Sequence, residues 1–453
     1  MARKARKKKL ELDNAQLVLA ALEAGESERV HEILTGLHPA DIGALLEGLP
    51  PEQRHPVWAR VDSEVAGEVL LEVPEAVRQD LIREMDGAQL VLAARALDID
   101  DIADLIPDLS DEVISEILFA LDKQDRQRLD AVLSYAEDTA GGLMNVDTVT
   151  VRENITAEVV LRYLRARGEL PEHTNSLFVV DRSDRLLGIL SLDKLLTASP
   201  GQRVTQIMQR DLVSFTATAP DREVAEAFER YNLITAPVVD DNGRLLGRIT
   251  VDDVVDVIRE EADRELLNLV GLREEEDLFS SVWQSVRNRW TWLAVNLVTA
   301  LIASRVIGLF EHSIEKLVAL AALMPIVAGI GGNSGNQTIT MIVRALALGQ
   351  LKTETIRKLL LKEIGVSLLN GLIWGGLLGA VAWGLYRNLS LALVMTAAMT
   401  LNLLLASVAG VGIPYLRQRL GRDPALGSSV MITAITDSGG FFIFLGLATL
   451  FLL

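Results

Sequence analysis

The chain has 453 residues and a net charge of −18, and nearly half of its residues are hydrophobic. It contains no cysteine, which excludes disulfides, thiolate metal sites and cysteine nucleophiles. From Val286 onward there are thirteen Lys and Arg residues against six Asp and Glu residues, a balance of +7, so the first 285 residues carry the remaining −25. A strongly acidic first half therefore precedes a hydrophobic, mildly basic second half.

The chain is predicted to begin with a basic tail and a helical domain. Six of residues 1–9 are Lys or Arg, which suits either a solubilising tail or weak attraction to anionic lipid. Residues 10–134 have the pattern of short amphipathic helices interrupted by Pro or Gly, with acidic residues opposite each hydrophobic face. The segments that begin at Leu37, Val61 and Ala96 are variants of one theme, which predicts an all-α superhelical stack.

Residues 135–260 change to alternating strands and helices, and this pattern occurs twice. Each copy, near Ser176 and near Ala236, has an apolar strand, an Asp-rich turn, a second strand and a helix. The doubled pattern resembles a pair of CBS domains, which usually regulate an attached domain and many of which bind adenine nucleotides. In nucleotide-binding copies, an Asp three residues after the Ser or Thr that follows the second strand often holds the ribose. That position is Lys194 in the first copy and Asp253 in the second, so half of the signal for ATP is present.

Residues 261–286 separate this pair from the apolar half of the chain. Acidic and basic residues alternate there around apolar ones such as Leu266 and Val282. We expect a connecting helix that transmits movement of the CBS pair to the first membrane span. A plain spacer is the alternative.

Residues 287–453 are predicted to form a helical membrane domain with five spans. The first long apolar stretch begins near Trp290, so we expect no cleavable signal peptide and a cytoplasmic first half. In the second span, Pro325 and the glycines of residues 329–332 should kink or unwind the helix. The five spans cover about residues 290–310, 317–348, 364–386, 389–416 and 425–453.

The distribution of basic residues predicts the orientation of these spans. Arg287 and Arg289 precede the first span, and seven further Lys and Arg residues lie between spans two and three and between spans four and five. The opposite side has only Arg305, Lys316 and Arg387. The positive-inside rule then places the N-terminus in the cytoplasm and the C-terminus outside, for a multi-pass protein of the cell (inner) membrane.

Asp437 lies deep inside the last apolar stretch, where a carboxylate costs at least roughly 2.5–3.5 kcal/mol on insertion scales. Chains keep such a group where it faces a polar path, so a cation pathway is the default interpretation. On a helix, Ser429 and Thr433 share a stripe with Asp437. The alternatives are a structural ion pair with Arg344 and, for the glycines, a simple tight helix crossing. The predicted pore cation site comprises Asp437, Thr433, Ser429, Asn333, Asn336 and Gln337.

Three motifs and the order of the domains carry a resemblance to a known family. The motifs are Tyr135-Ala-Glu-Asp-Thr-Ala-Gly-Gly-Leu-Met, Gly331-Gly-Asn-Ser-Gly-Asn-Gln, and Asp423-Pro-Ala followed by Asp437. Over nearly its whole length the chain resembles the MgtE family of magnesium channels and transporters. The resemblance implies Mg²⁺ influx through a homodimer in a lipid membrane, with two Asp437 side chains facing one another on the pore axis. It also implies negative feedback, in which cytosolic Mg²⁺ bound between the acidic domains favours the closed state.

The resemblance further implies a set of regulatory metal ligands in the acidic half, although any one of them could be a solvated surface residue. Two positions depart from the family pattern, because Arg222 and Asn232 stand where the family has acidic residues. We expect these replacements to weaken some of the sensing sites. The pore wall departs at Gly427-Ser-Ser-Val430, where the family commonly has a helix-breaking Pro. The implied regulatory ligands are Glu68, Asp100, Asp104, Asp253, Asp256, Glu261 and Glu265.

Two other functions remain open. A carrier for Co²⁺, Mn²⁺ or Ni²⁺ could use the same scaffold, but the predicted spans contain no His and no Cys, which argues against a soft-metal site. An intramembrane aspartyl protease needs two carboxylates, whereas the predicted spans offer only Asp437. We therefore expect no enzymatic activity, and no nucleic-acid partner.

Overall fold

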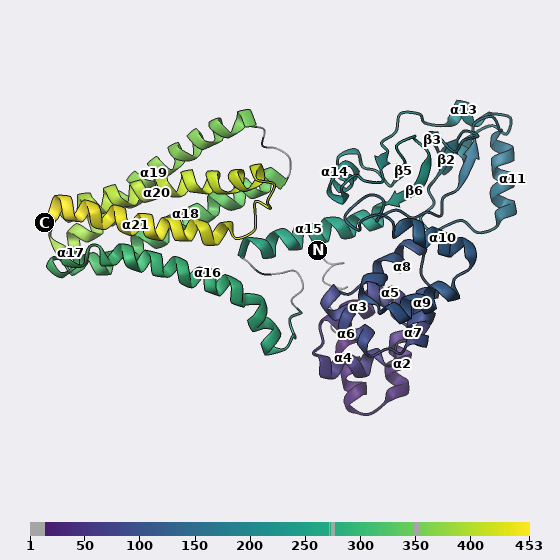
Figure 1. Ribbon diagram of the computed structural model, residues 1–453, viewed down its shortest axis with the longest axis horizontal. Coiled ribbons are helices and arrows are strands. Elements are labelled where there is room, and N and C mark those ends of the chain that lie inside the picture. Colours follow the sequence, from purple (N-terminus) through teal and green to yellow (C-terminus); the bar gives the residue numbers. More distant parts are fainter. Residues whose placement is uncertain (1–13, 271, 273–276, 348–350, 352) are drawn as a thin grey trace. The chain divides into compact units, whose positions relative to one another are not determined.

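The computed structural model describes residues 14–270, 272, 277–347, 351 and 353–453. The chain divides into two compact units (Figure 1). The first consists of Met1–Glu261 with Asp277–Phe279, and the second of Ala262–Glu276 with Ser280–Leu453. Each unit has its own hydrophobic core, so we describe them separately.

The first unit begins with short helices, as the Pro, Gly and Asp punctuation of the sequence predicts. Asp86 closes a capping box with Gln89, and the Asp122 side chain accepts hydrogen bonds from two backbone N–H groups of the helix that it begins. Leu46, Leu70 and Leu81 are fully buried in the shared core. Residues 14–23 are helical, followed by α2 (Ser27–Thr35), α3 (Pro39–Glu47), α4 (Pro51–Trp58), α5 (Ser63–Leu71), α6 (Glu75–Arg83), α7 (Gly87–Arg95), α8 (Ile99–Leu105), η1 (Ile106–Asp108), α9 (Asp111–Ala120) and α10 (Lys123–Val132).

Two three-stranded sheets with the same topology follow, so the predicted repeat is confirmed. In each sheet the first two strands are parallel and the last two antiparallel, and the register shifts at the equivalent place, Val179/Val180 and Val238/Val239. The first module contains β1 (Thr150–Arg152), α11 (Ala157–Arg167), β2 (Ser176–Val180), β3 (Leu186–Ser191), α12 (Leu192–Thr197) and α13 (Val204–Ile207). The second contains β4 (Phe215–Thr216), α14 (Asp221–Tyr231), β5 (Thr235–Val239), β6 (Leu245–Thr250) and the start of α15 (Val251–Val270).

The segment predicted as a connecting helix, residues 261–286, is not one helix. Its first part is the end of α15, which runs on from the second module to Val270. Residues 277–281 are not helical, and α16 (Val282–Gly308) begins anew after Ser281, whose hydroxyl accepts a hydrogen bond from the Gln284 N–H. This N-cap explains the break, because a capping serine has a non-helical backbone.

The second unit is a bundle of long helices (Figure 1). After α16 come α17 (Glu311–Lys316), α18 (Ala319–Ala347), α19 (Thr353–Tyr386), α20 (Leu389–Arg419) and α21 (Ser428–Leu452). Within the described residues, four segments are long and apolar enough to cross a membrane: Val282–Gly308, Thr355–Tyr386, Leu389–Arg419 and Ser428–Leu452. The helix α18, whose middle is rich in Gly and Asn, is not among them, so the fifth span stays a prediction.

The second span is predicted to kink or unwind, and the unwinding is wrong, because α18 is continuous from Ala319 to Ala347 with Pro325 near its start. Its glycines serve close packing instead. A Cβ atom added at Gly335 would overlap the side chain of Ile432 on α21, and one added at Gly331 would overlap that of Asn402 on α20. The tight helix crossing, which the sequence left as the alternative, is therefore the one observed.

Candidate cation pathway and acidic junction

The helix α21 carries Asp437 on a polar stripe, as the spacing of the sequence predicts. Ser429 and Asp437 are half-buried and Thr433 is exposed. The Thr433 hydroxyl donates a hydrogen bond to the Ser429 carbonyl at 2.9 Å, which leaves the lone pairs of the hydroxyl oxygen free to face a cation. This stripe offers one carboxylate and further neutral oxygens.

The polar middle of α18 lies against this part of α21. The two helices run antiparallel, since a Cβ atom at Gly332 would lie 3.5 Å from Thr436 Oγ1, whereas Gly335 meets Ile432 one turn earlier on α21. Asn333 and Asp437 each follow one member of the Gly332–Thr436 pair. Asn333 and Gln337 are exposed and Asn336 is half-buried. We call Asn333, Asn336, Gln337, Ser429, Thr433 and Asp437 together the pathway residues.

Asp423 joins three elements at the start of α21, a role that the sequence did not reveal. Its carboxylate accepts hydrogen bonds from Asn268 Nδ2 of α15 at 3.0 Å and from the Ala425 N–H at 2.8 Å. Its carbonyl accepts from Arg417 Nε at the end of α20 at 2.8 Å. The Asn268 carbonyl in turn accepts from the Gly427 N–H at 3.2 Å. The end of α15 is thus bonded directly to the segment that starts the Asp437 helix.

Gly427 explains part of the sequence departure at this place. It caps α21 with a φ of 66°, a left-handed conformation that favours glycine. A Cβ atom there would overlap the ring of Trp292 on α16. The following Ser428 is fully buried and its hydroxyl donates to the Pro424 carbonyl at 2.6 Å. A left-handed glycine and a buried serine therefore begin the helix here.

In the first unit, predicted regulatory acids from the helical domain and from the second CBS module approach each other. Burial, together with the neighbouring carboxylates of Asp101 and Asp98, raises the pKa of Asp100 to about 7. Burial also raises the pKa of Asp253 to about 7, and Asp100 and Asp252 add to this effect. We call Asp98, Asp100, Asp101 and Asp253 the acidic junction. A cation near these carboxylates would reduce their mutual repulsion and stabilise their charged form.

Two polar residues hold the acidic junction together. Asn145 Nδ2 donates to Asp100 Oδ1 at 3.0 Å, and the backbones of Asn145 and Arg248 are paired by two hydrogen bonds of 2.8 and 2.9 Å. The Arg248 side chain is buried, and its charge opposes the rise in the pKa of Asp98. On the CBS side, Asp253 accepts from the Thr250 N–H and hydroxyl at 3.2 and 3.0 Å.

Asp104 also lies with these acids, since burial and the neighbouring Asp253 carboxylate raise its pKa to about 7. The other predicted regulatory ligands are not gathered there, because Glu68 and Asp256 are exposed and the Glu265 side chain lies outside the described residues. Glu261 is paired with Arg222 Nη1 at 3.4 Å, so the basic residue at the departing position faces one of the implied ligands. Within the described parts of the chain, no three His, Asp or Glu side chains converge closely enough to hold a metal ion. The oxygen donors of the junction suit Mg²⁺, but holding it requires them to draw together.

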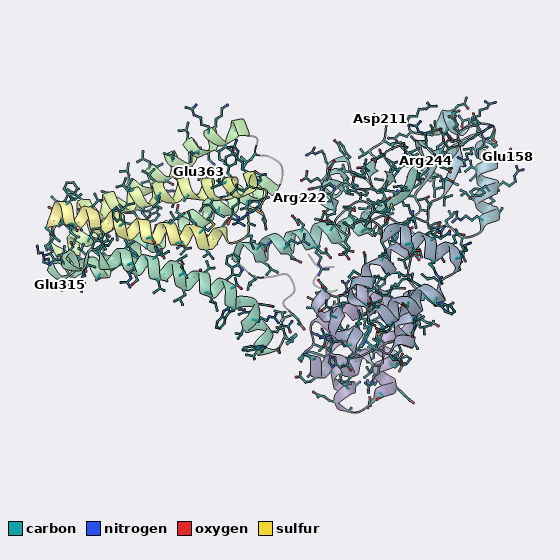
Figure 2. All side chains as sticks on the ribbon, in the orientation of Figure 1. Glu158, Asp211, Arg222, Arg244, Glu315 and Glu363 are labelled. Atoms are coloured by element: carbon teal, nitrogen blue, oxygen red, sulfur yellow. The ribbon has the colours of Figure 1, made fainter. Side chains whose placement is uncertain are left out.

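Two buried polar residues of the helix bundle were missed by the sequence analysis. Glu363 lies ten residues into α19, packed against Thr338 Oγ1 of α18 at 3.5 Å and Lys362 Nζ at 3.3 Å (Figure 2). The expected third span began at Ile364, which left this carboxylate outside, so the statement that only Asp437 is acidic within the spans is wrong. Asn402 of α20 is fully buried. In the sequence it is a single polar residue within an apolar stretch, and nothing around it indicates that it is buried.

Comparison with known proteins identifies the family. Residues 324–447 match MgtE, a divalent cation transporter, residues 37–138 match the MgtE intracellular N domain, and residues 140–201 and 204–260 match the CBS domain. The chain is 35% identical over 441 residues to the magnesium transporter MgtE of Thermus thermophilus, which covers 95% of this chain and 97% of that protein. It is 26% identical over 435 residues to the magnesium transporter MgtE of Bacillus subtilis, with 96% of each chain covered.

Among solved structures, the chain is similar to the cytosolic domain of the Mg²⁺ channel MgtE in complex with ATP. The identity is 35%, the TM-score is 0.49, and the match covers 54% of this chain and 99% of that one. The family domains occur in the order that the sequence predicts, and the relatives match over nearly their full length. The chain therefore belongs to the MgtE family of magnesium transporters.

Proposed function

We propose that this chain carries Mg²⁺ across a membrane along the pathway residues of α18 and α21. Both sequence relatives are named magnesium transporters, and this supports the ion. The observation that carries the proposal is Asp437, a half-buried carboxylate within a helix apolar enough to span a membrane, beside a helix that exposes Asn333 and Gln337. A carboxylate and amides facing lipid would be costly, so they line a polar path.

The donor set suits Mg²⁺ as the transported ion. Mg²⁺ gives up its water slowly and is usually held by one or two carboxylates with several waters retained. A single Asp437 with hydroxyl and amide oxygens around it fits a hydrated ion better than a dehydrated one. The absence of imidazole from this donor set disfavours Ni²⁺, whereas Mn²⁺ accepts the same oxygen ligands as Mg²⁺ and is the competitor that the donor set excludes least.

A second copy of the chain completes the path. The exposed polar side chains of α18 and α21 need a cover within the bilayer, and two copies related by a two-fold axis would place two Asp437 carboxylates across one channel. This assembly requires α18 to be a fifth span. With the N-terminus in the cytoplasm, five spans put the C-terminus outside, as the positive-inside rule predicts.

Cytosolic Mg²⁺ controls the path from the first half of the chain. An ion bound at the acidic junction would relieve the repulsion of Asp100 and Asp253 and draw the helical domain toward the second CBS module. The bonds of Asn268 to Asp423 and Gly427 offer a direct route from α15 to the start of α21. Since Arg222 already pairs with Glu261, we expect fewer Mg²⁺ ions to act and a weaker feedback than a full set of acids would give.

ATP is a second ligand of the CBS pair in this proposal, at one site rather than two. The ribose position is Asp253 in the second module, where its carboxylate is held by Thr250, and Lys194 in the first. Titration of the full chain with ATP, followed by the same titration of Asp253→Ala, tests it. Equal ATP binding by both would contradict the assignment.

Uptake in cells that lack other Mg²⁺ carriers tests the pathway. We expect Asp437→Ala to lose Mg²⁺ uptake while remaining folded and inserted, and the neighbouring Ser438→Ala to retain it as the matched control. Competition by Co²⁺, Mn²⁺ or Ni²⁺ as strong as that of Mg²⁺ itself would favour the general divalent carrier. Full Mg²⁺ uptake by Asp437→Ala would overturn the pathway.

Uptake at rising cytosolic Mg²⁺ tests the control. Asn268→Ala removes the side-chain bond to Asp423 and should leave transport less inhibited by internal Mg²⁺, with unchanged uptake when internal Mg²⁺ is low. The exposed Asp263→Asn variant of α15, which is not a predicted regulatory ligand, is the control for a general effect on that helix. If Asn268→Ala is inhibited like the parent protein, this coupling route is wrong.

A further inference from the structure

Asn402 is a fully buried amide in the middle of α20. Its Nδ2 group donates a hydrogen bond to the Val327 carbonyl of α18 at 2.9 Å. Its Oδ1 atom has no hydrogen-bond partner in the part of the chain that the structure describes. A buried amide with one unsatisfied atom destabilises a helix bundle, so its presence calls for a reason beyond filling space.

The amide of Asn402 is enclosed by two glycines from two different helices. A Cβ atom added at Gly331 of α18 would lie 2.9 Å from Asn402 Cγ and would overlap Nδ2. A Cβ atom added at Gly440 of α21 would lie 2.7 Å from Nδ2 and 3.0 Å from Cγ. Both glycines are thus required while Asn402 is present, and one side chain fixes the positions of α18 and α21 together.

These glycines stand beside the pathway residues. Gly331 is two residues before Asn333, and Gly440 is three residues after Asp437 on the same helix. Gly332 of α18 and Thr436 of α21, which face each other across the two helices, directly precede Asn333 and Asp437. A shift of either helix along its axis would therefore change the packing around the Asn402 side chain. The same shift would change the position of Asn333 along the helix axis relative to Asp437.

We propose that Asn402 is a positioning residue of the cation pathway: wedged between Gly331 and Gly440 and bonded to the Val327 carbonyl, it sets the register of Asn333 against Asp437. This inference rests on the proposed pathway and adds a residue to it that touches no cation. A leucine of similar size would keep the volume of the wedge but lose the bond to Val327. The register would then loosen, and the oxygen atoms would hold a hydrated Mg²⁺ less well.

The experiment compares Mg²⁺ flux into liposomes by the purified full chain and by Asn402→Leu. We expect the Mg²⁺ concentration for half-maximal flux to rise about tenfold or more, while the maximal flux falls less and the melting temperature stays within about 5 °C. The matched control is Thr400→Val, a buried residue of the same helix that faces Gly371 of α19 instead. It should leave the half-maximal concentration unchanged.

A second pair of variants tests the wedge itself, whether or not Asn402→Leu folds. Gly331→Ala should abolish flux in the parent protein, because its methyl group overlaps the amide. In the Asn402→Ala background, which removes the overlapping atoms, the same substitution should be tolerated, with flux at least about tenfold above that of Gly331→Ala alone. Equal damage by Gly331→Ala in both backgrounds would overturn the wedge.

The outcomes separate this inference from the pathway. If Asp437→Ala loses flux but Asn402→Leu saturates with Mg²⁺ like the parent protein, the positioning role is wrong and the pathway stands. A loss of flux by Asn402→Leu in proportion to the loss of folded protein, with half-maximal Mg²⁺ unchanged, also overturns it. If Asp437→Ala transports normally, the pathway and the positioning role fall together.

Discussion

Replacing Asp253 by Asn should relieve the repulsion within the acidic junction and strengthen the packing of α8 against the second CBS module. The substitution keeps the shape of the side chain and removes one of the crowded carboxylates. Asp253 and Asp100 each raise the pKa of the carboxyl groups around them, so the remaining acids gain as well. Mg²⁺ bound at the junction should have the same effect without a mutation.

The magnitude follows from the pKa of Asp253. A rise from 3.8 to about 7 corresponds to about 4 kcal/mol of free energy at pH values well above 7, since one pKa unit is worth about 1.4 kcal/mol. Burial is the largest cause of this rise, and it also desolvates an Asn at the same position, so only part of this free energy is recovered. We therefore expect Asp253→Asn to stabilise the junction by about 1.5–3 kcal/mol, or about tenfold to a hundredfold in its opening equilibrium.

The sign of the pH dependence is fixed by the direction of the shift. Because the pKa is higher in the folded junction than in the unfolded chain, protonation stabilises the folded form. This stabilisation is complete below pH 3.8 and is lost as the pH rises through about 7. Without Mg²⁺, the parent protein should therefore open more readily at pH 8 than at pH 6, and Asp253→Asn should show a smaller change.

Hydrogen exchange of the full chain in detergent measures this opening at α8, after correction for the intrinsic pH dependence of exchange. At pH 8 without Mg²⁺, the Ile99–Leu105 peptide should exchange about tenfold or more slowly in Asp253→Asn than in the parent protein. Asp263→Asn, an exposed acid on the same helix that is not a predicted regulatory ligand, should change nothing there. Exchange that is unchanged in Asp253→Asn, or equally slowed in Asp263→Asn, would refute the reasoning.

Two other substitutions test buried charges of the first unit. Arg54 is fully buried and contacts Asp277 at 3.0 Å, so Arg54→Met should cost about 3–5 kcal/mol by leaving that carboxylate unpaired, whereas Arg29→Gln in an exposed pair should cost at most about 1 kcal/mol. Chemical denaturation followed at the helical domain compares them, and equal losses would contradict the role of burial. Arg248→Met removes the positive charge that counters the repulsion around Asp98. Hydrogen exchange of α8 without Mg²⁺ should therefore be faster in this variant, and Mg²⁺ should restore the rate of the parent protein. Slower exchange would show that the guanidinium is not a counter-ion there.

The sequence was most informative where the pattern is local. The capping signals around Asp86 and Asp122 mark helix starts, and the strand–turn–strand–helix repeat predicts two modules because each turn repeats the same Asp and Gly chemistry. The stripe of Ser429, Thr433 and Asp437 follows from helix geometry alone. These features depend on residues that are close in the chain, so one sequence is enough to find them.

The parts that failed depend on residues far apart in the chain. The glycines of α18 predict a break only if nothing packs on them, and Asn402 and Ile432 do so from other helices. Arg222 meets Glu261 through the fold, which spacing does not reveal. Glu363 was assigned to a loop because its span begins with polar residues on the side that later packs against Thr338. Such contacts arise from tertiary packing, and a single sequence does not record them.

The central claim is that the Asp437 carboxylate is the charge that admits Mg²⁺. The most direct test is Mg²⁺ flux into liposomes that contain the purified full chain, compared between the parent protein and Asp437→Asn. This substitution keeps the size of the side chain and removes only its charge. The account predicts flux at the level of empty liposomes for Asp437→Asn, with the protein still folded and inserted. Flux equal to that of the parent protein would contradict it.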